Sequence, residues 1–274
     1  MKGDKKIYLV LGLSLLFLFT IWALFPGVFA PYDIKHSFKP FLKPSSVHFL
    51  GTNDLGYDIF SELVHATFTT LTIGLTAAFV TIVIGGVIGL LAGYLQGVSG
   101  DILDGVINIF LLIPMLPMVI AVSAFFGSNN RNIVIIIAML GWCSTAKAVR
   151  ARVRQLKQME FVEALITLGM DKKHIIFFHI LPNTWHIISA QYILTVANCM
   201  LTEASVSFMG LGDVTRVTWG GMISTAFKRG GFVKGQINWY LSPGVCITLC
   251  VLAFLWINLY VREKNQLTGE SYLE

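Results

Sequence analysis

Few side chains in this sequence could do chemistry, and they are widely dispersed. Glu203 is an acidic residue in an otherwise apolar run that also contains Asn198. An ionisable group at membrane depth is a functional candidate, because burying an unpaired charge there is costly. His36, His48 and His65 share no metal-ligand spacing, so we expect solvent-exposed histidines and no metal site there.

The remaining histidines and the cysteines give no stronger indication of a reactive centre. His174 and His179 are five residues apart, so on an α-helix they should not face each other. No C-x-x-C pair or P-loop of the form G-x-x-x-x-G-K-[ST] occurs. We therefore expect no enzyme activity and no cofactor in this chain itself. The cysteines lie in apolar runs, which predicts small buried side chains: Cys143, Cys199, Cys246 and Cys250.

The composition decides what kind of elements must position these residues. The chain has 274 residues, of which 55% are hydrophobic and 13% are charged. These proportions predict an all-α polytopic protein in a lipid bilayer. The net charge of +5 comes mostly from basic residues beside apolar runs, which is typical of the positive-inside rule and not of a nucleic-acid surface.

Six apolar runs predict about six transmembrane helices with both termini in the cytoplasm. The first is too long for the core of a signal peptide, so we interpret it as a retained span. Residues 1–66 would hold this helix and an outer segment, residues 67–262 the transmembrane core, and residues 263–274 a cytoplasmic tail. Twelve of the 20 Lys and Arg residues fall in inner segments and eight outside, so charge alone leaves the opposite orientation open. The expected spans are 7–30, 68–94, 105–126, 132–146, 184–205 and 239–260.

Glycines and prolines occur within these spans at positions that affect helix packing and shape. Gly85, Gly89 and Gly93 share one helix face and predict close helix packing. Pro114 and Pro117 should kink the third span and leave some backbone carbonyls without helical hydrogen bonds. The kink would serve either helix packing or a water-lined cavity. Four residues are candidates for a substrate pathway, each with packing as the alternative: Pro114, Pro117, Asn198 and Glu203.

A polar and basic segment, residues 147–185, separates the fourth and fifth spans. Phe161, Ala164, Leu165 and Leu168 have the spacing of one helix face. Gly169 can end that helix in the left-handed conformation. Asp171 is a candidate cap for a second short helix, and Pro182 should bend the chain before the next span. The two short helices predict a docking surface, or alternatively helices that rest on lipid headgroups.

Four stretches in the same order resemble one family of proteins. Glu163–Gly169, followed by Leu181-Pro182, resembles the cytoplasmic E-A-A loop of permease subunits of bacterial ABC importers. Phe49–Asp58 is similar to the L-G-T-D-x-L-G-R-D segment of dipeptide, oligopeptide and nickel permeases, and Glu203–Gly212 to their E-A-S-L-S-F-L-G-L-G segment. Trp219-Gly220 follows at the expected distance. The resemblance is closest to the second permease of the pair.

The sequence also departs from this pattern. Tyr57 replaces the arginine of L-G-R-D, and Glu62 replaces the arginine of the following S-R. Leu165 stands at the third position of E-A-A, and His179 replaces an aliphatic residue before Leu-Pro. The Pro-Pro after G-L-G is absent. The outer, substrate-facing details therefore transfer less well than the loop.

The resemblance implies a membrane permease subunit that forms half of a translocation pathway in an inner-membrane importer for peptides or nickel-type solutes. Its implied partners are a second homologous permease, two ATP-binding subunits that hold ATP and Mg, and an outer substrate-binding protein. A self-contained secondary transporter is the alternative, and it would require an inverted repeat. The implied coupling residues are Phe161, Glu163, Ala164, Leu165, Leu168, Gly169, Leu181 and Pro182.

Overall fold

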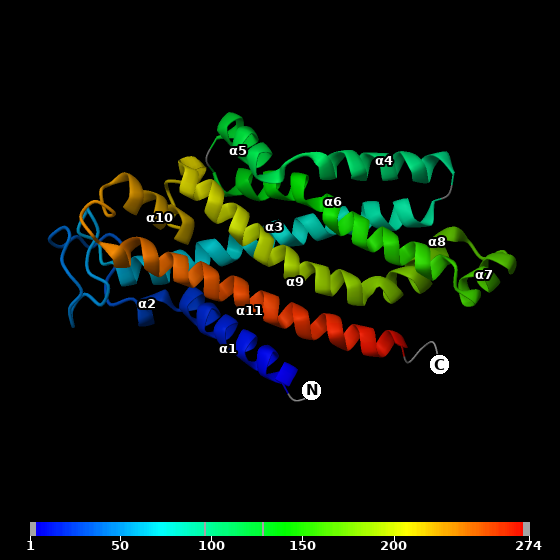
Figure 1. The fold of residues 1–274 in the computed structure, drawn as a ribbon, viewed down its shortest axis with the longest axis horizontal. Coiled ribbons are helices and arrows are strands. Elements are labelled where there is room, and N and C mark those ends of the chain that lie inside the picture. The colour runs from blue at the N-terminus through cyan, green and yellow to red at the C-terminus, as the bar shows by residue number, and fades with distance from the viewer. Residues whose placement is uncertain (1–3, 96, 128, 271–274) are drawn as a thin grey trace.

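The computed structural model describes residues 4–95, 97–127 and 129–270, and shows an elongated bundle of helices (Figure 1). Five of the described helices are long and apolar enough to cross a membrane, and a bent pair brings the number to six. The expected all-α polytopic fold is confirmed. The helices are α1 (Asp4–Leu24), α2 (Pro26–Phe29), α3 (Ile59–Tyr94), α4 (Val98–Leu112), α5 (Met115–Phe126), α6 (Asn130–Lys157), α7 (Glu160–Thr167), α8 (Lys172–His174), η1 (Ile175–Ile180), α9 (Leu181–Val206), η2 (Ser207–Leu211), α10 (Trp219–Lys228) and α11 (Ile237–Glu270).

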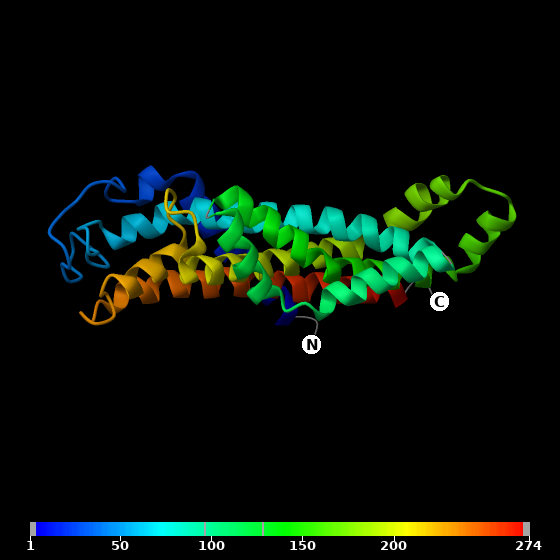
Figure 2. The same cartoon turned by 90° about the horizontal axis from the view of Figure 1, so that it is seen from above.

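The long helices run alternately between two ends of the bundle. Helix α7 lies at one end, and α10 lies at the other with the irregular segment 31–58 (Figures 1 and 2). We call these the α7 end and the α10 end. Helices α1 and α11 pack against each other, and the C-terminal part of α11 approaches the α7 end. Helix α1 lies at the edge of the bundle, with only 11% of its most apolar window buried, so most of its surface is left for lipid or another subunit.

The second span begins earlier than expected. It was predicted at residues 68–94, with an irregular segment before it, but α3 starts at Ile59. Asp58 caps this start because its carboxylate accepts a hydrogen bond from the backbone N–H of Ser61, at 2.8 Å. Buried Leu63 and Val64 then hold the added turns against the bundle. The irregular segment is shorter as a result.

The third span is broken where one proline falls between two helices. Helices α4 and α5 meet at an angle of 85° at the break before Met115. Pro114 occupies the N-cap position of α5, whereas Pro117 falls in its first turn, where a missing N–H removes no helical hydrogen bond. Only Pro114 therefore interrupts the span. Helix α4 begins at Val98, so most of the inner turn expected at residues 96–104 is helical, and Gln96 lies outside the described residues.

The helices on either side of the polar segment are longer than their apolar runs. Helix α6 continues to Lys157, so the basic residues expected in a loop lie on its last turns. On the other side, one helix runs from Lys172 to Leu211 through α8, η1, α9 and η2. Helix α11 likewise continues through most of the expected tail, whose last residues, 271–274, lie outside the described residues.

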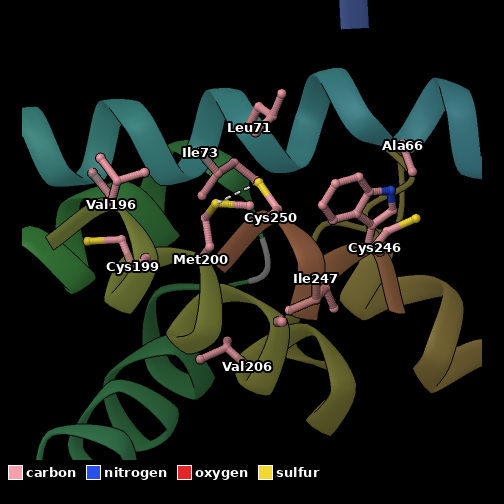
Figure 3. Packing of buried hydrophobic residues seen from close by; sticks show 14 of the residues in the cluster. Ala66, Leu71, Ile73, Val196, Cys199, Met200, Val206, Cys246, Ile247 and Cys250 are labelled. Carbon is pink, nitrogen blue, oxygen red and sulfur yellow. Dashed lines mark hydrogen bonds between the residues drawn. The ribbon is translucent and has the colours of Figure 1, made fainter. Parts of the chain in front are cut away.

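Close packing along α3 organises the core. A Cβ atom added at Gly85 would lie 2.5 Å from the Trp142 carbonyl oxygen, and one at Gly89 would lie 2.6 Å from that of Ala146. Gly93 meets Val153 in the same way, so the predicted glycine face is a packing seam against α6. Figure 3 shows the adjoining core of α3, α9 and α11. The four cysteines are buried, as expected.

Candidate functional site

Helix α7 is closed at its C-terminus by a Schellman motif. Gly169 has φ 72° and donates its backbone N–H to the carbonyl of Ile166, at 3.0 Å. The N–H of Met170 reaches the carbonyl of Leu165, at 3.2 Å. These two bonds satisfy carbonyls that a helix end leaves open, and the positive φ requires a residue such as glycine. Gly169 therefore ends α7 as the sequence indicates.

The predicted apolar face of α7 is divided between two surroundings. Phe161 is 41% exposed and Leu168 is 78% exposed, and Ala164 is also exposed. Leu165 instead packs beside Val162, which is fully buried, in a cluster with residues of α6 and η1. The inward pair attaches α7 to the bundle, and the outward three leave an apolar surface facing away from it. Glu163 is exposed in the first helical turn, where the helix dipole favours an acidic residue.

The chain does not bend away at Pro182. A π-helical turn precedes it, in which Leu181 donates its N–H to the carbonyl of Ile176. Pro182 then occupies the first turn of α9, where its missing N–H is tolerated. The wider turn also corrects an expectation from spacing, because in a π-helix residues five apart become neighbours. The rings of His174 and His179 lie 5.7 Å apart, centroid to centroid, and therefore do face each other.

Polar contacts tie the helices together at the α7 end. Lys157 donates a hydrogen bond of 2.7 Å to the Tyr94 carbonyl, and its ammonium group lies over the Tyr94 ring. Asp104 of α4 forms ion pairs with Arg150 and Arg154 of α6. Helix α7 follows directly from α6, so its position depends on these contacts. Asp171 stands at the N-cap of α8, but its side chain makes no capping hydrogen bond.

At the α10 end, residues 49–58 form a compact cap over the start of α3. Asn53 is 2% exposed, and its side-chain oxygen accepts N–H bonds of 2.9 Å from both Leu55 and Tyr57. The expectation that His48 is solvent-exposed is wrong. His48 is 5% exposed, and its Nδ1 lies 2.9 Å from Asp58 Oδ1. The buried ring fills the cap and pairs with the carboxylate that caps α3.

Glu203 and Asn198 do not form one polar site. Glu203 is fully buried, and its Oε1 accepts a hydrogen bond of 2.6 Å from Ser207. Its Oε2 has no hydrogen-bond partner. Asn198 is exposed on another side of the same helix. Pro114 and Pro117 are also exposed, so the four pathway candidates do not converge in this chain.

Trp219 anchors α10 between α3 and α9. Its side chain is fully buried, and its indole N–H donates to the Leu63 carbonyl, at 3.2 Å. Its backbone N–H donates to the hydroxyl of Thr70, at 3.1 Å. The next residue, Gly220, touches the backbone of Ala204, where a Cβ atom would lie 2.6 Å from Cα. The Trp-Gly pair thus fixes α10 beside Glu203.

A cavity of about 350 Å³ opens between the cap and α10. We call it the α10-end cavity. Its lining includes Glu62 and Tyr57 as well as the basic residues Arg216 and Lys228. Asp213 also belongs to the lining.

Asp213 keeps its charge at this end of the protein. Partial burial would raise its pKa, but hydrogen bonds from Thr215 and from the backbone of Asn130, together with the charge of Arg216, lower that pKa below its ordinary value. The bond to Asn130, at 3.3 Å, joins the segment before α10 to the start of α6. Asp213 is therefore a charged connection between these elements.

Comparison of the sequence with known families identifies the family of this chain. Residues 85–264 match the family described as "Binding-protein-dependent transport system inner membrane component". This chain belongs to that family. The permease also covers most of the length of the three relatives described below. The resemblance drawn from the sequence is thus confirmed, and a permease subunit is supported over a self-contained secondary transporter.

Three relatives illustrate the similarity. The permease is 33% identical over 247 residues to the glutathione transport system permease protein GsiD of Pectobacterium atrosepticum, covering 89% of this chain and 81% of the relative. It is 31% identical over 246 residues to the oligopeptide transport system permease protein OppC of Bacillus subtilis, covering 88% and 79%. It is 30% identical over 257 residues to the dipeptide transport system permease protein DppC of Alkalihalophilus pseudofirmus, covering 93% and 84%.

Family membership sets the coarse context of the permease. It is a multi-pass inner-membrane component that works with an ATPase and a substrate-binding protein. Sequence reasoning missed Val162, which attaches α7 to the bundle, and Asn53, which organises the cap. Val162 follows Phe161 directly in the sequence, and both are apolar. Only the structure shows which side of α7 faces the bundle, and therefore that Val162 is buried while Phe161 is exposed.

Proposed function

We propose that this chain forms one half of the translocation pathway of an ATP-driven importer and receives the movement of ATPase subunits through α7. The observation that carries the proposal is the outward apolar surface of α7. Phe161, Ala164 and Leu168 are exposed on a helix that buried Val162 and the Gly169 closure hold in place. An amphipathic helix of this kind fits an apolar groove of a partner.

The α7 end faces the cytoplasm in this proposal, as do both termini. Basic residues support this orientation, because Arg150, Arg154 and Lys157 gather on the last turns of α6. The full assembly contains a second homologous permease, two ATPase subunits and an outer substrate-binding protein. ATP and Mg are held by the ATPase subunits, since the permease sequence contains no P-loop.

The coupling residues divide into three roles. Phe161, Ala164 and Leu168 contact the ATPase groove, and Glu163 fixes the register at its edge. Leu165 and Gly169 hold the shape of α7. Leu181 and Pro182 form the start of α9, directly after the π-turn that joins it to α8, so a movement of α7 reaches the span that carries Glu203.

A peptide-type solute is the proposed cargo. The relatives described above are named for glutathione, oligopeptide and dipeptide transport, and none of these three names includes nickel. No group of three or more His, Cys, Asp or Glu residues in the described part of the chain is arranged to hold a metal ion. Together these observations favour peptides over nickel.

Leu168→Asp tests the docking surface. Leu168 is 78% exposed, so the substitution should leave the amount of inserted protein unchanged while adding a charge to the apolar contact. Burying an unpaired charge in a groove is costly. We expect ATP-dependent uptake by the reconstituted importer to fall at least tenfold, and co-purification of the ATPase to weaken.

Val233→Asp is the matched control. Val233 is 88% exposed but lies after α10, at the opposite end of the bundle. The control should retain its ATPase partner. Normal uptake by Leu168→Asp, or equal loss of the ATPase from both variants, would refute the proposed role of α7. ATP hydrolysis by the purified permease alone would refute the division of labour.

A further inference from the structure

The α10-end cavity contains both positions at which this chain departs from the arginines of the family pattern. Tyr57 stands in place of the arginine of L-G-R-D, and Glu62 in place of the arginine of S-R. Both side chains line the cavity. An arginine-to-glutamate replacement exchanges a side chain that only donates hydrogen bonds for a carboxyl group that accepts them, so this position favours a ligand with N–H donors.

The hydrogen-bond partner of Glu62 is an uncharged side chain. Its Oε2 accepts a hydrogen bond of 3.1 Å from the side-chain amide of Asn53. Asn53 is fixed in that orientation because its oxygen is occupied by two backbone N–H groups. Among the ion pairs of the described residues, none includes Glu62. The carboxyl group of Glu62 is therefore held in a fixed position by a neutral partner.

The neighbouring acidic group engages one of the arginines that line the cavity. Asp54 also lines the cavity, and its Oδ2 pairs with Arg229 at 3.0 Å. Arg229 is thus paired with Asp54 and forms no ion pair with Glu62.

The lining of the cavity also contacts a buried acidic residue. Ser207 lines the cavity and donates a hydrogen bond to Glu203, which is fully buried. The same lining contains Arg216 and Lys228, which supply positive charge.

We propose that the α10-end cavity binds the primary ammonium group of the transported solute, with Glu62 as its carboxylate partner. This inference rests on the proposed function of the chain in peptide import. An ammonium group has three N–H donors, which suit the acceptors of Glu62, Asp54 and Tyr57. The absence of a metal-binding group among the described residues favours an organic cation over a metal ion.

The rest of the solute fits the remaining features of the cavity. A carboxylate at its other end would face Arg216 and Lys228, which would orient a small zwitterion across the opening. The volume of about 350 Å³ lies at the small end of ligand cavities, which are on the order of 300–1,000 Å³, and suits a dipeptide better than a long peptide.

Carboxylate footprinting tests the contact directly on the assembled importer in lipid nanodiscs, without the substrate-binding protein. A water-soluble carbodiimide and glycine ethyl ester label accessible carboxylates, and mass spectrometry reads the labelling of Glu62. Alanyl-alanine at millimolar concentration should protect Glu62, whereas N-acetyl-alanyl-alanine should not. Exposed Asp33, outside the cavity, is the internal control and should be labelled equally in every sample. Absent protection, or equal protection by both compounds, would overturn the proposal.

Uptake kinetics provide the second readout. Glu62→Gln keeps the shape and the hydrogen bond from Asn53 but removes the charge, so it should raise the KM for alanyl-alanine about tenfold, with little change in kcat. An unchanged KM would count against the proposal. If the wild-type importer carries no peptide at all, the proposed cargo fails, and the footprint still decides whether Glu62 recognises an ammonium group.

Discussion

Gly169→Ala is predicted to weaken coupling by straining one backbone position. Gly169 has φ 72°, and no atom lies within 4 Å of the place where a Cβ would be added. The substitution therefore creates no clash with a neighbouring residue. Its effect comes only from the backbone, because alanine disfavours the left-handed conformation. This destabilises the Schellman motif that closes α7.

The loss of ATPase affinity follows from the conformational cost of alanine at this position. A left-handed conformation costs an L-residue other than glycine about 1–2 kcal/mol. A change of this size shifts a two-state equilibrium by a factor of about 5–30. If the ATPase binds only the form of α7 that the Schellman motif closes, the strain lowers the population of that form. The apparent Kd for the ATPase subunit then rises, at most by this factor.

The measurement is the affinity of the ATPase subunit for the permease in nanodiscs, together with the melting temperature. Gly230→Ala is the matched control, because Gly230 has φ 81° and equally open surroundings but lies after α10. Gly169→Asn should retain most of the affinity, since asparagine tolerates the left-handed region. Equal weakening by Gly169→Ala and Gly230→Ala, or unchanged binding in Gly169→Ala, would refute the reasoning.

Two further predictions concern the bundle and its α10 end. Gly89→Ala puts a methyl group against the backbone of α6 and should destabilise the protein by about 1–3 kcal/mol, measured as a lower melting temperature. Gly86→Ala is the control, because nothing lies within 4 Å of its added Cβ, and it should be neutral or stabilising. A lower melting temperature for Gly86→Ala than for Gly89→Ala would contradict the packing seam. Because hydrogen bonds lower the pKa of Asp213, its contribution to stability is present at neutral pH and lost as pH falls through the lowered value, below about pH 4. Amide exchange at Thr215, measured relative to an unprotected amide, should therefore lose protection only in strong acid, whereas Asp213→Asn should weaken this protection already at pH 7.

The helical membrane fold could be predicted because it depends on features that local sequence carries. Apolar runs of sufficient length specify spans, and the four-residue repeat of Gly85, Gly89 and Gly93 specifies a close helix contact. Gly169 could likewise be assigned from its position after an amphipathic pattern. These predictions required no knowledge of distant contacts.

Other features depend on where each helix begins and on contacts between residues distant in the sequence, which the sequence does not show directly. Pro114 and Pro117 are the same residue type three positions apart, yet only Pro114 breaks the span, because Pro117 falls in the first turn of the next helix. The π-turn before Pro182 changes which residues are neighbours, and so reverses the expectation for His174 and His179. His48 is buried by a carboxylate that also caps α3, a contact visible only once the cap is folded.

The helix from Lys172 to Leu211 runs without a break as far as a kink at Gly210, which has φ 87°, and its length is therefore constrained. Its 40 residues extend over about 60 Å. One residue inserted within it would turn everything beyond the insertion by about 100° and move it by about 1.5 Å, carrying Glu203 out of its buried position. The irregular residues 31–47, which precede the compact cap, are under no helical constraint of this kind. Natural variation in length should therefore accumulate there, whereas a deletion in the long helix before Glu203 would be absorbed most readily at the π-turn Ile175–Ile180, by tightening into an α-turn.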